Sequence, residues 1–154
     1  MILFTDGSVE VKSGTGFGAY VAVPDINESL EDIARKIRLK RFDATSSTRL
    51  ELQTLLWALG EIRCSEVEVY TDSQNIPGLL KRRERLEKNN YCTKAGKLHQ
   101  HWELYRDFFA WVDSIDIRVI KISGHSPRGK KTKLNEIFSL VDKACRNALR
   151  SRIS

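Results

Sequence analysis

Two short apolar segments, far apart in the chain, each lead into an aspartate. Residues 2–5 (ILFT) are followed by Asp6, and residues 67–71 (VEVYT) are followed by Asp72. Segments of this length and composition are typical of buried β-strands. A carboxylate at the end of such a strand is costly unless it is paired or bound to a cation. If the two strands are neighbours in one sheet, both carboxylates lie near the same edge, which constrains the fold and indicates a site there.

The other segments predict a mixed α/β domain. We expect a Gly-rich turn at residues 14–18 and a hairpin connection at residues 25–32. Helices are predicted from hydrophobic periodicity at residues 48–62, from residue 73 onward, and at residues 99–112 and 134–150. Strands are predicted at residues 1–6, 19–23, 33–41, 66–71 and 115–122. Three antiparallel strands followed by two parallel strands reached through helices give a five-stranded mixed sheet flanked by helices.

Composition predicts a single soluble domain. The chain has 154 residues, of which 41% are hydrophobic and 30% charged. That length is ample for one hydrophobic core, and no apolar run approaches the ~20 residues of a membrane span. The N-terminus lacks the basic region of a signal peptide. Three widely spaced cysteines fit unpaired thiols in a reducing compartment. We therefore expect one catalytic domain over residues 1–154, monomeric, cytoplasmic and not bound to a membrane.

The positive charge is unevenly distributed. The net charge is +6, and the basic residues concentrate in residues 81–97, 128–133 and 143–152, while the rest of the chain is acidic. Such an asymmetry favours an anionic polymer, and hence nucleic acid, as the partner. The alternative is that each basic segment is a solvated surface face.

Two further acidic residues stand on predicted helices. Glu51 lies early on the helix at residues 48–62, and Asp142 lies on the apolar side of the last helix. Thr48 and Glu51 also match a capping box, so a helix cap is the alternative role for Glu51. Four clustered carboxylates cannot all stay ionised without cations, and hard oxygen ligands suit Mg²⁺ or Mn²⁺. Two such ions about 4 Å apart are a known arrangement for hydrolysis of a phosphodiester.

His125 follows the last predicted strand in a Gly- and Pro-containing loop. A loop histidine there can transfer protons to or from a leaving group or an attacking water. The alternative is an exposed histidine without a role.

Six motifs resemble type 1 ribonuclease H and follow the order of that family. They are FTDGS at residues 4–8, GFGA at 16–19, TRLEL at 48–52, TDSQ at 71–74, GH at 124–125 and VDK at 141–143. The resemblance implies the ribonuclease H fold and Mg²⁺-dependent endonucleolytic hydrolysis of the RNA strand of RNA–DNA hybrids, giving 5′-phosphomonoester ends. It implies that Asp6, Glu51, Asp72 and Asp142 are catalytic metal ligands for two Mg²⁺ ions. It also implies that His125 is catalytic, in proton transfer or product release.

Substrate contacts are expected in three regions. Ser47 and Thr48 replace two asparagines that the family often places before the arginine of the helix motif, and their hydroxyls have shorter reach. The segment after His125 looks longer than usual, and its basic residues either grip phosphates or form a flap over the site. The expected substrate-binding residues are Gly7, Ser8, Ser47, Thr48, Arg49, Ser73, Gln74, Lys81, Arg82, Arg83, Arg128, Lys130 and Lys131.

Two rival functions remain open from the sequence. One is a nuclease of the same fold that acts on DNA or double-stranded RNA. The other is a non-catalytic nucleic-acid-binding module, against which the intact acidic quartet argues, because carboxylates facing phosphates do not help a pure binder.

Overall fold

The molecule is built on a five-stranded sheet with the strand order β3-β2-β1-β4-β5. The computed structural model describes residues 1–123 and 132–153. The strands β1, β2 and β3 pair antiparallel, and β4 and β5 extend the sheet in parallel from β1. This confirms the predicted mixed sheet. The strands are β1 (Ile2–Glu10), β2 (Thr15–Val23), β3 (Arg38–Phe42), β4 (Glu66–Thr71) and β5 (Asp116–Lys121).

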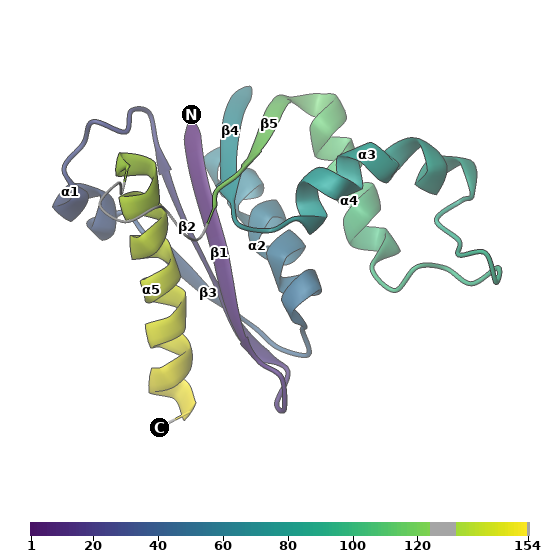
Figure 1. The fold of residues 1–154 in the computed structure, drawn as a ribbon, viewed down its shortest axis with the longest axis horizontal. Helices are drawn as coiled ribbons and strands as arrows, with labels where there is room; N and C mark the ends of the chain where they lie inside the picture. The colour runs from purple at the N-terminus through teal and green to yellow at the C-terminus, as the bar shows by residue number, and fades with distance from the viewer. Residues whose placement is uncertain (124–131, 154) are drawn as a thin grey trace.

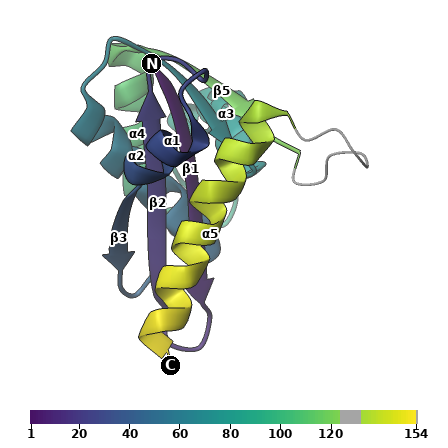
Figure 2. The ribbon, with the colours of Figure 1, turned by 90° about the vertical axis from the view of Figure 1, so that its left-hand side faces the viewer.

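Helices cover both faces of the sheet, as Figures 1 and 2 show. One face carries α1 and α5, and the other carries α2, α3 and α4. Leu3 and Phe4, adjacent in β1, are both fully buried but belong to the two different cores, because successive side chains of a strand point to opposite faces. The helices are α1 (Leu30–Arg35), α2 (Ser47–Ile62), α3 (Asn75–Lys88), α4 (Trp102–Ser114) and α5 (Lys133–Ile153). None of the described helices has the length and apolar character needed to cross a bilayer.

Glycines let α2 approach the sheet closely. A Cβ on Gly18 would lie 2.2 Å from Oγ1 of Thr54, and a Cβ on Gly7 would lie 2.8 Å from Cδ2 of Leu50. Gly7 and Gly18 are direct partners in the β1–β2 register. The prediction of a turn over residues 14–18 was therefore wrong, because β2 already begins at Thr15 and only Gly14, with φ +70°, takes a turn conformation.

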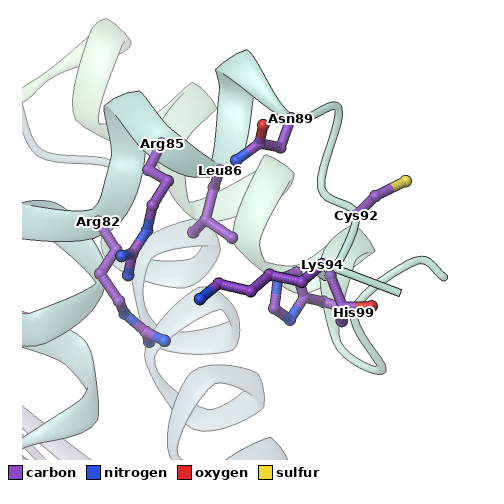
Figure 3. Close-up of a pocket in the computed structure, with 8 residues that line it drawn as sticks. Arg82, Arg85, Leu86, Asn89, Cys92, Lys94 and His99 are labelled. Carbon is purple, nitrogen blue, oxygen red and sulfur yellow. The ribbon is translucent and has the colours of Figure 1, made fainter. Parts of the chain in front are cut away.

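The connection between α3 and α4 is a compact hairpin of residues 89–101. The backbone N–H of Tyr91 donates to Leu86 O at 2.7 Å, and that of His99 donates to Tyr91 O at 2.8 Å. Cys92 and Leu98 form an isolated antiparallel bridge. Figure 3 shows this hairpin beside the end of α3. The helix predicted from His99 instead begins at Trp102, because the backbone of His99 is engaged in closing the hairpin.

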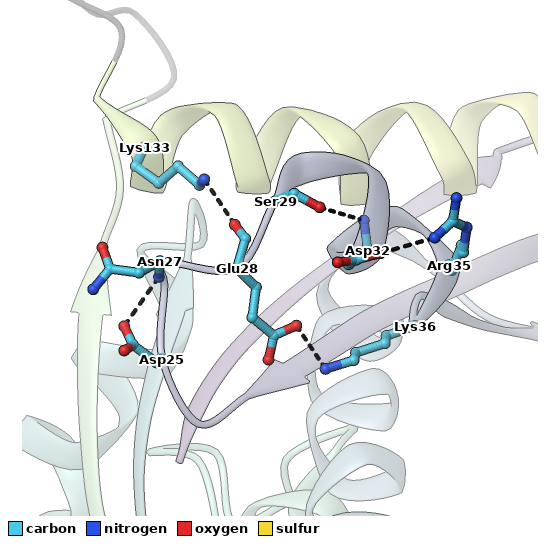
Figure 4. A network of polar contacts seen from close by, with 8 residues as sticks. All are labelled: Asp25, Asn27, Glu28, Ser29, Asp32, Arg35, Lys36 and Lys133. Carbon is cyan, nitrogen blue, oxygen red and sulfur yellow. Dashed lines mark hydrogen bonds and ion pairs between the residues drawn. The ribbon is translucent and has the colours of Figure 1, made fainter.

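The short helix α1 replaces part of a predicted strand. The strand expected at residues 33–41 begins only at Arg38, and Ile33 lies in α1, fully buried. Ser29 caps this helix by accepting a hydrogen bond from the backbone N–H of Asp32 at 3.1 Å (Figure 4). An ion pair of 2.6 Å between Lys36 and Glu28 joins the segments on either side of this helix. The alternation that suggested a strand therefore combined one helical and one strand segment.

Candidate active site

Asp6 and Asp72 come together because β1 and β4 are parallel neighbours. Phe4 pairs with Tyr70, so the same register carried two residues further places Asp6 level with Asp72. Asp72 follows the last residue of β4, as predicted. Asp6 does not end its strand, because β1 continues to Glu10 through its pairing with β2. The central carboxylate is therefore held in the middle of a continuous strand.

Asp142 reaches Asp6 from α5. Along β1 the side chain of Asp6 points to the same face as Phe4, and this is the face that α5 covers. Carboxylate oxygens of Asp6 and Asp142 and the Sγ of Cys145 all lie within 4.8 Å of one another. The Cys145 thiol donates to the backbone oxygen of Asp142 at 3.2 Å. The Asp142 carboxylate also pairs with Arg146 at 2.7 Å.

Glu51 faces the site from α2, on the opposite side of the sheet. The Ser73 hydroxyl donates to Oε2 of Glu51 at 2.6 Å, and the Asn75 side-chain amide donates to the same oxygen at 3.4 Å. The structure rules out the capping box. Ser46 is the N-cap of α2, and its hydroxyl accepts from the backbone N–H of Arg49. Glu51 is therefore positioned by the start of α3 rather than by its own helix end.

The carboxylates form one electrostatic cluster. Burial raises the pKa of Asp6 to about 8, helped by the negative charge of Asp72 and a hydrogen bond with Asp142. Desolvation followed by the charge of Asp142 raises the pKa of Asp72. Burial also raises the pKa of Glu51, against the hydrogen bonds from Ser73 and Asn75. Each shift disfavours the ionised form, and a nearby cation would reverse it.

The donor set of this cluster fits a divalent metal ion. Four carboxylates from β1, α2, the end of β4 and α5 offer hard oxygen ligands, which Mg²⁺ and Mn²⁺ prefer. The buried Cys145 thiol adds a soft atom, and burial and the neighbouring carboxylates raise its pKa well above the usual range. A protonated thiol is a poor ligand, so the carboxylates are the groups suited to hold the ion.

Several residues expected to contact substrate lie on the same elements as the carboxylates, or next to them in the chain. Gly7 and Ser8 continue β1 beyond Asp6, while Ser47, Thr48 and Arg49 form the first turn of α2. Gln74 is exposed at the start of α3. Ser73 is buried, and its hydroxyl is already engaged with Glu51.

Among the basic residues of α3 that were expected to contact substrate, Arg83 is engaged within the protein, whereas Lys81 and Arg82 form no ion pair with the described residues. Arg83 binds Asp113 with two hydrogen bonds of 2.7 Å, pairs with Glu87, and stacks over the ring of Phe109. Its guanidinium therefore fastens α3 to α4. Lys81 is exposed on the same helix, and Arg82 donates to the Gly78 carbonyl at 3.4 Å.

The remaining expected residues, His125, Arg128, Lys130 and Lys131, lie outside the described part of the chain. The basic segment resumes at Lys133, whose ammonium donates to the backbone oxygen of Glu28 at 2.8 Å (Figure 4). This contact connects the start of α5 to the segment before α1. The ammonium group of Lys133 is therefore engaged within the protein.

Sequence reasoning missed three residues at the site: Cys145, Asn75 and Arg146. Cys145 and Arg146 follow Asp142 by three and four positions on one helix, a spacing that places side chains on the same face. That spacing was a usable signal for both. No such spacing signal existed for Asn75, because its contact with Glu51 depends on the direction that the chain takes between β4 and α3.

Comparisons with known proteins bear on the fold and the family of the chain. The structure of the foamy viral protease-reverse transcriptase in complex with dsDNA is similar with a TM-score of 0.66 and 15% identity, covering 95% of this chain and 94% of that chain. A comparison with curated proteins finds no match. The RNase H family model matches residues 1–149, which include all four carboxylates. On the strength of this match and the mixed sheet with its acidic cluster, the chain belongs to the RNase H family.

Proposed function

We propose that this protein is a ribonuclease H that hydrolyses the RNA strand of RNA–DNA hybrids with two bound Mg²⁺ ions. The observation that carries the proposal is the convergence of Asp6, Glu51, Asp72 and Asp142, from four different elements, into one electrostatically coupled cluster. A structural role would not favour carboxylates so placed that the charges of Asp72 and Asp142 raise the pKa values of their neighbours.

Each residue has a distinct part in this mechanism. Asp6 and Asp72 would hold the ions at the centre, with Glu51 and Asp142 completing the ligand set from α2 and α5. When bound, the two ions supply activation of the attacking water and stabilisation of the charge on the leaving oxygen. Ser73 fixes the orientation of Glu51, and Arg146 fixes that of Asp142.

Nucleic-acid binding would use the surface around the cluster. Ser47, Thr48 and Gln74 offer hydroxyl and amide groups able to read 2′-hydroxyls, which distinguish an RNA strand from DNA. Lys81 and Arg82 on α3 would contact backbone phosphates, so affinity should fall steeply with salt. His125 would transfer a proton or assist product release.

The test is cleavage of matched hybrid, RNA-duplex and DNA-duplex substrates in Mg²⁺ and in EDTA. We expect the RNA strand of the hybrid alone to be cut, only with the metal, leaving 5′-phosphate ends. The Asp72→Asn variant should be inactive. Asp116→Asn, which makes the same change at the far end of the sheet, should retain the parent rate.

Each other result has a defined meaning. Preferential cutting of DNA or RNA duplex would assign a different substrate to the same site. Binding of hybrid without cleavage would indicate a non-catalytic module. Parent-level activity of Asp72→Asn would overturn the metal-site assignment.

A further inference from the structure

A second candidate site lies outside the carboxylate cluster, between the C-terminal half of α3 and the hairpin of residues 89–101. A pocket of about 560 Å³ opens there, within the ~300–1,000 Å³ range of small-molecule sites. α3 contributes Arg82, Arg85 and Leu86, and the hairpin contributes Lys94 and His99. None of the described residues that line it is acidic.

The cations of this pocket converge. Figure 3 shows the Lys94 side chain reaching back from the hairpin toward the guanidinium groups of Arg82 and Arg85, below Leu86. Within the described residues, no ion pair forms at any of these three side chains. A concave site lined by one sign of charge concentrates the opposite ion.

The stability of α3 accounts for only part of this arrangement. Basic residues in the last turn of a helix interact favourably with its macrodipole, and this interaction alone explains an arginine at position 85. The macrodipole gives no reason for Lys94 or His99, which come from the hairpin. The neighbouring Arg83 has a structural role in the same helix, because its guanidinium binds Asp113 and Glu87. Arg82 and Arg85 form no such ion pair with the described residues. The convergence of the pocket cations is therefore a feature that a ligand would use.

The pocket is preformed rather than a chance gap between side chains. The hairpin is closed by the Cys92–Leu98 bridge and by the hydrogen bond from Thr93 N–H to Lys97 O at 2.7 Å. The ring of Tyr91 stacks against Phe109 of α4, with ring centres 6.4 Å apart. The backbone that carries Lys94 and His99 is therefore anchored to α3 and α4 before any ligand arrives, which lowers the entropic cost of binding.

The chemistry of the pocket selects a compact anion with several charges. A backbone phosphodiester carries one negative charge, whereas a terminal phosphate monoester carries nearly two at neutral pH. Arginine pairs offer bidentate hydrogen bonds to phosphate, and Lys94 adds a point charge. The buried Leu86 and the imidazole of His99 provide apolar and ring surface beside these charges.

We propose that this pocket is a non-catalytic site for a terminal phosphate group, carried either by a free nucleotide or by a phosphorylated nucleic-acid end. It is separate from the carboxylate cluster and does not depend on cleavage. A ligand bound here would occupy the basic surface of α3 and so compete with, or orient, a nucleic acid that reaches the carboxylates.

Calorimetric titration of the metal-free protein in EDTA tests this without any catalytic readout. The probes are inorganic tripolyphosphate, ATP, and one single-stranded DNA oligonucleotide prepared with a 5′-phosphate and with a 5′-hydroxyl. We expect one binding site, at least about tenfold tighter for the 5′-phosphate form, because each charge-assisted contact changes affinity by about that factor. Stronger binding of ATP or of the phosphorylated end identifies which source of the phosphate the site prefers.

Matched variants complete the test. Arg85→Gln/Lys94→Gln should weaken binding of tripolyphosphate at least about tenfold. Lys12→Gln/Arg118→Gln removes the same charge at exposed positions outside the pocket and should leave binding unchanged. Equal affinity for the 5′-hydroxyl and 5′-phosphate oligonucleotides would overturn the proposal in favour of a backbone site. Absence of binding, or equal loss in both double variants, would overturn it altogether. None of these results depends on whether the protein cleaves the hybrid.

Discussion

The Ser73 hydroxyl donates a 2.6 Å hydrogen bond to Oε2 of Glu51, joining the segment after β4 to the second turn of α2. The hydroxyl also accepts from the backbone N–H of Asn75 at 3.1 Å, so its orientation is fixed from both sides. A ligand oriented in this way keeps its geometry whether or not substrate is present.

Loss of this hydroxyl should impair catalysis. We expect Ser73→Ala to lower the rate of hybrid cleavage, or the affinity for Mg²⁺, by about 10- to 100-fold, as is typical when the partner of a metal ligand is removed. The measurement is the cleavage rate over a series of Mg²⁺ concentrations. Ser73→Thr keeps the hydroxyl and should restore most of the activity. Ser114→Ala, which removes a hydroxyl bonded only to its own helix, should behave as the parent.

Removal of one carboxylate should stabilise the metal-free protein while it abolishes activity. Asp72 helps to raise the pKa of Asp6, so Asp72→Asn relieves repulsion inside the cluster. Because Asp72 is exposed and screened, the gain should be only about 0.5–1 kcal/mol in the free energy of unfolding. Urea denaturation in EDTA measures it. A loss of stability in Asp72→Asn would contradict the coupling between these residues.

Stability of the metal-free protein should fall as the pH rises from about 4 to about 8. The pKa of Asp6 is raised to about 8, so over this range the folded state binds a proton that the unfolded state has released. Its stabilising contribution is complete below pH 4 and is lost as the pH passes through 8. The slope should approach about −1.4 kcal/mol per pH unit for one proton.

Two comparisons isolate this effect. In Asp6→Asn the part of the slope that belongs to Asp6 should disappear. Saturating Mg²⁺ should flatten the profile of the parent, because the cation favours the ionised carboxylates. Urea unfolding at several pH values gives the slopes, and a profile that is level in EDTA would refute the assignment.

The contact between α2 and the sheet should tolerate no side chain at residue 18. A Cβ on Gly18 would meet not only Oγ1 of Thr54 but also its Cβ, at 3.1 Å, so rotation of the Thr54 side chain would still leave a tight contact that α2 must shift to relieve. We expect Gly18→Ala to lower the free energy of unfolding by about 1–3 kcal/mol. Gly60→Ala, on α2 with nothing within 4 Å, should be neutral or stabilising by up to about 1 kcal/mol. Thermal unfolding compares the two, and equal effects would contradict the contact.

Much of the sheet could be predicted from local pattern. The bounds of β4 were predicted correctly, and α2 begins within one residue of its predicted start, because both segments carry an unbroken periodic signal. The two aspartates at the ends of predicted strands suggested that β1 and β4 lie side by side in the sheet. The position of Asp6 inside β1 was not, because the extension to Glu10 depends on pairing with β2, which no local pattern encodes.

The site was predicted in its acidic residues but not in the groups that hold them. Asp6, Glu51, Asp72 and Asp142 stand out because carboxylates are costly beside buried residues. Asn75 contacts Glu51 through its side-chain amide, and the sequence does not show that the start of α3 lies beside α2. Gly16 and Gly18 were assigned to a turn, because a glycine that admits a helix against a strand looks the same in sequence as one that bends the chain.

The two helices that carry Glu51 and Asp142 lie on opposite faces of the sheet. Cations that are held by Asp6 and Asp72 and also bound by these two side chains would act as a cross-link between the two hydrophobic layers, in addition to any role in chemistry. Binding of the metal would then stabilise the whole of α5. The backbone amides of this helix would exchange with solvent more slowly in the metal-bound protein. Loading of the site and docking of the C-terminal helix would thus form a single cooperative event.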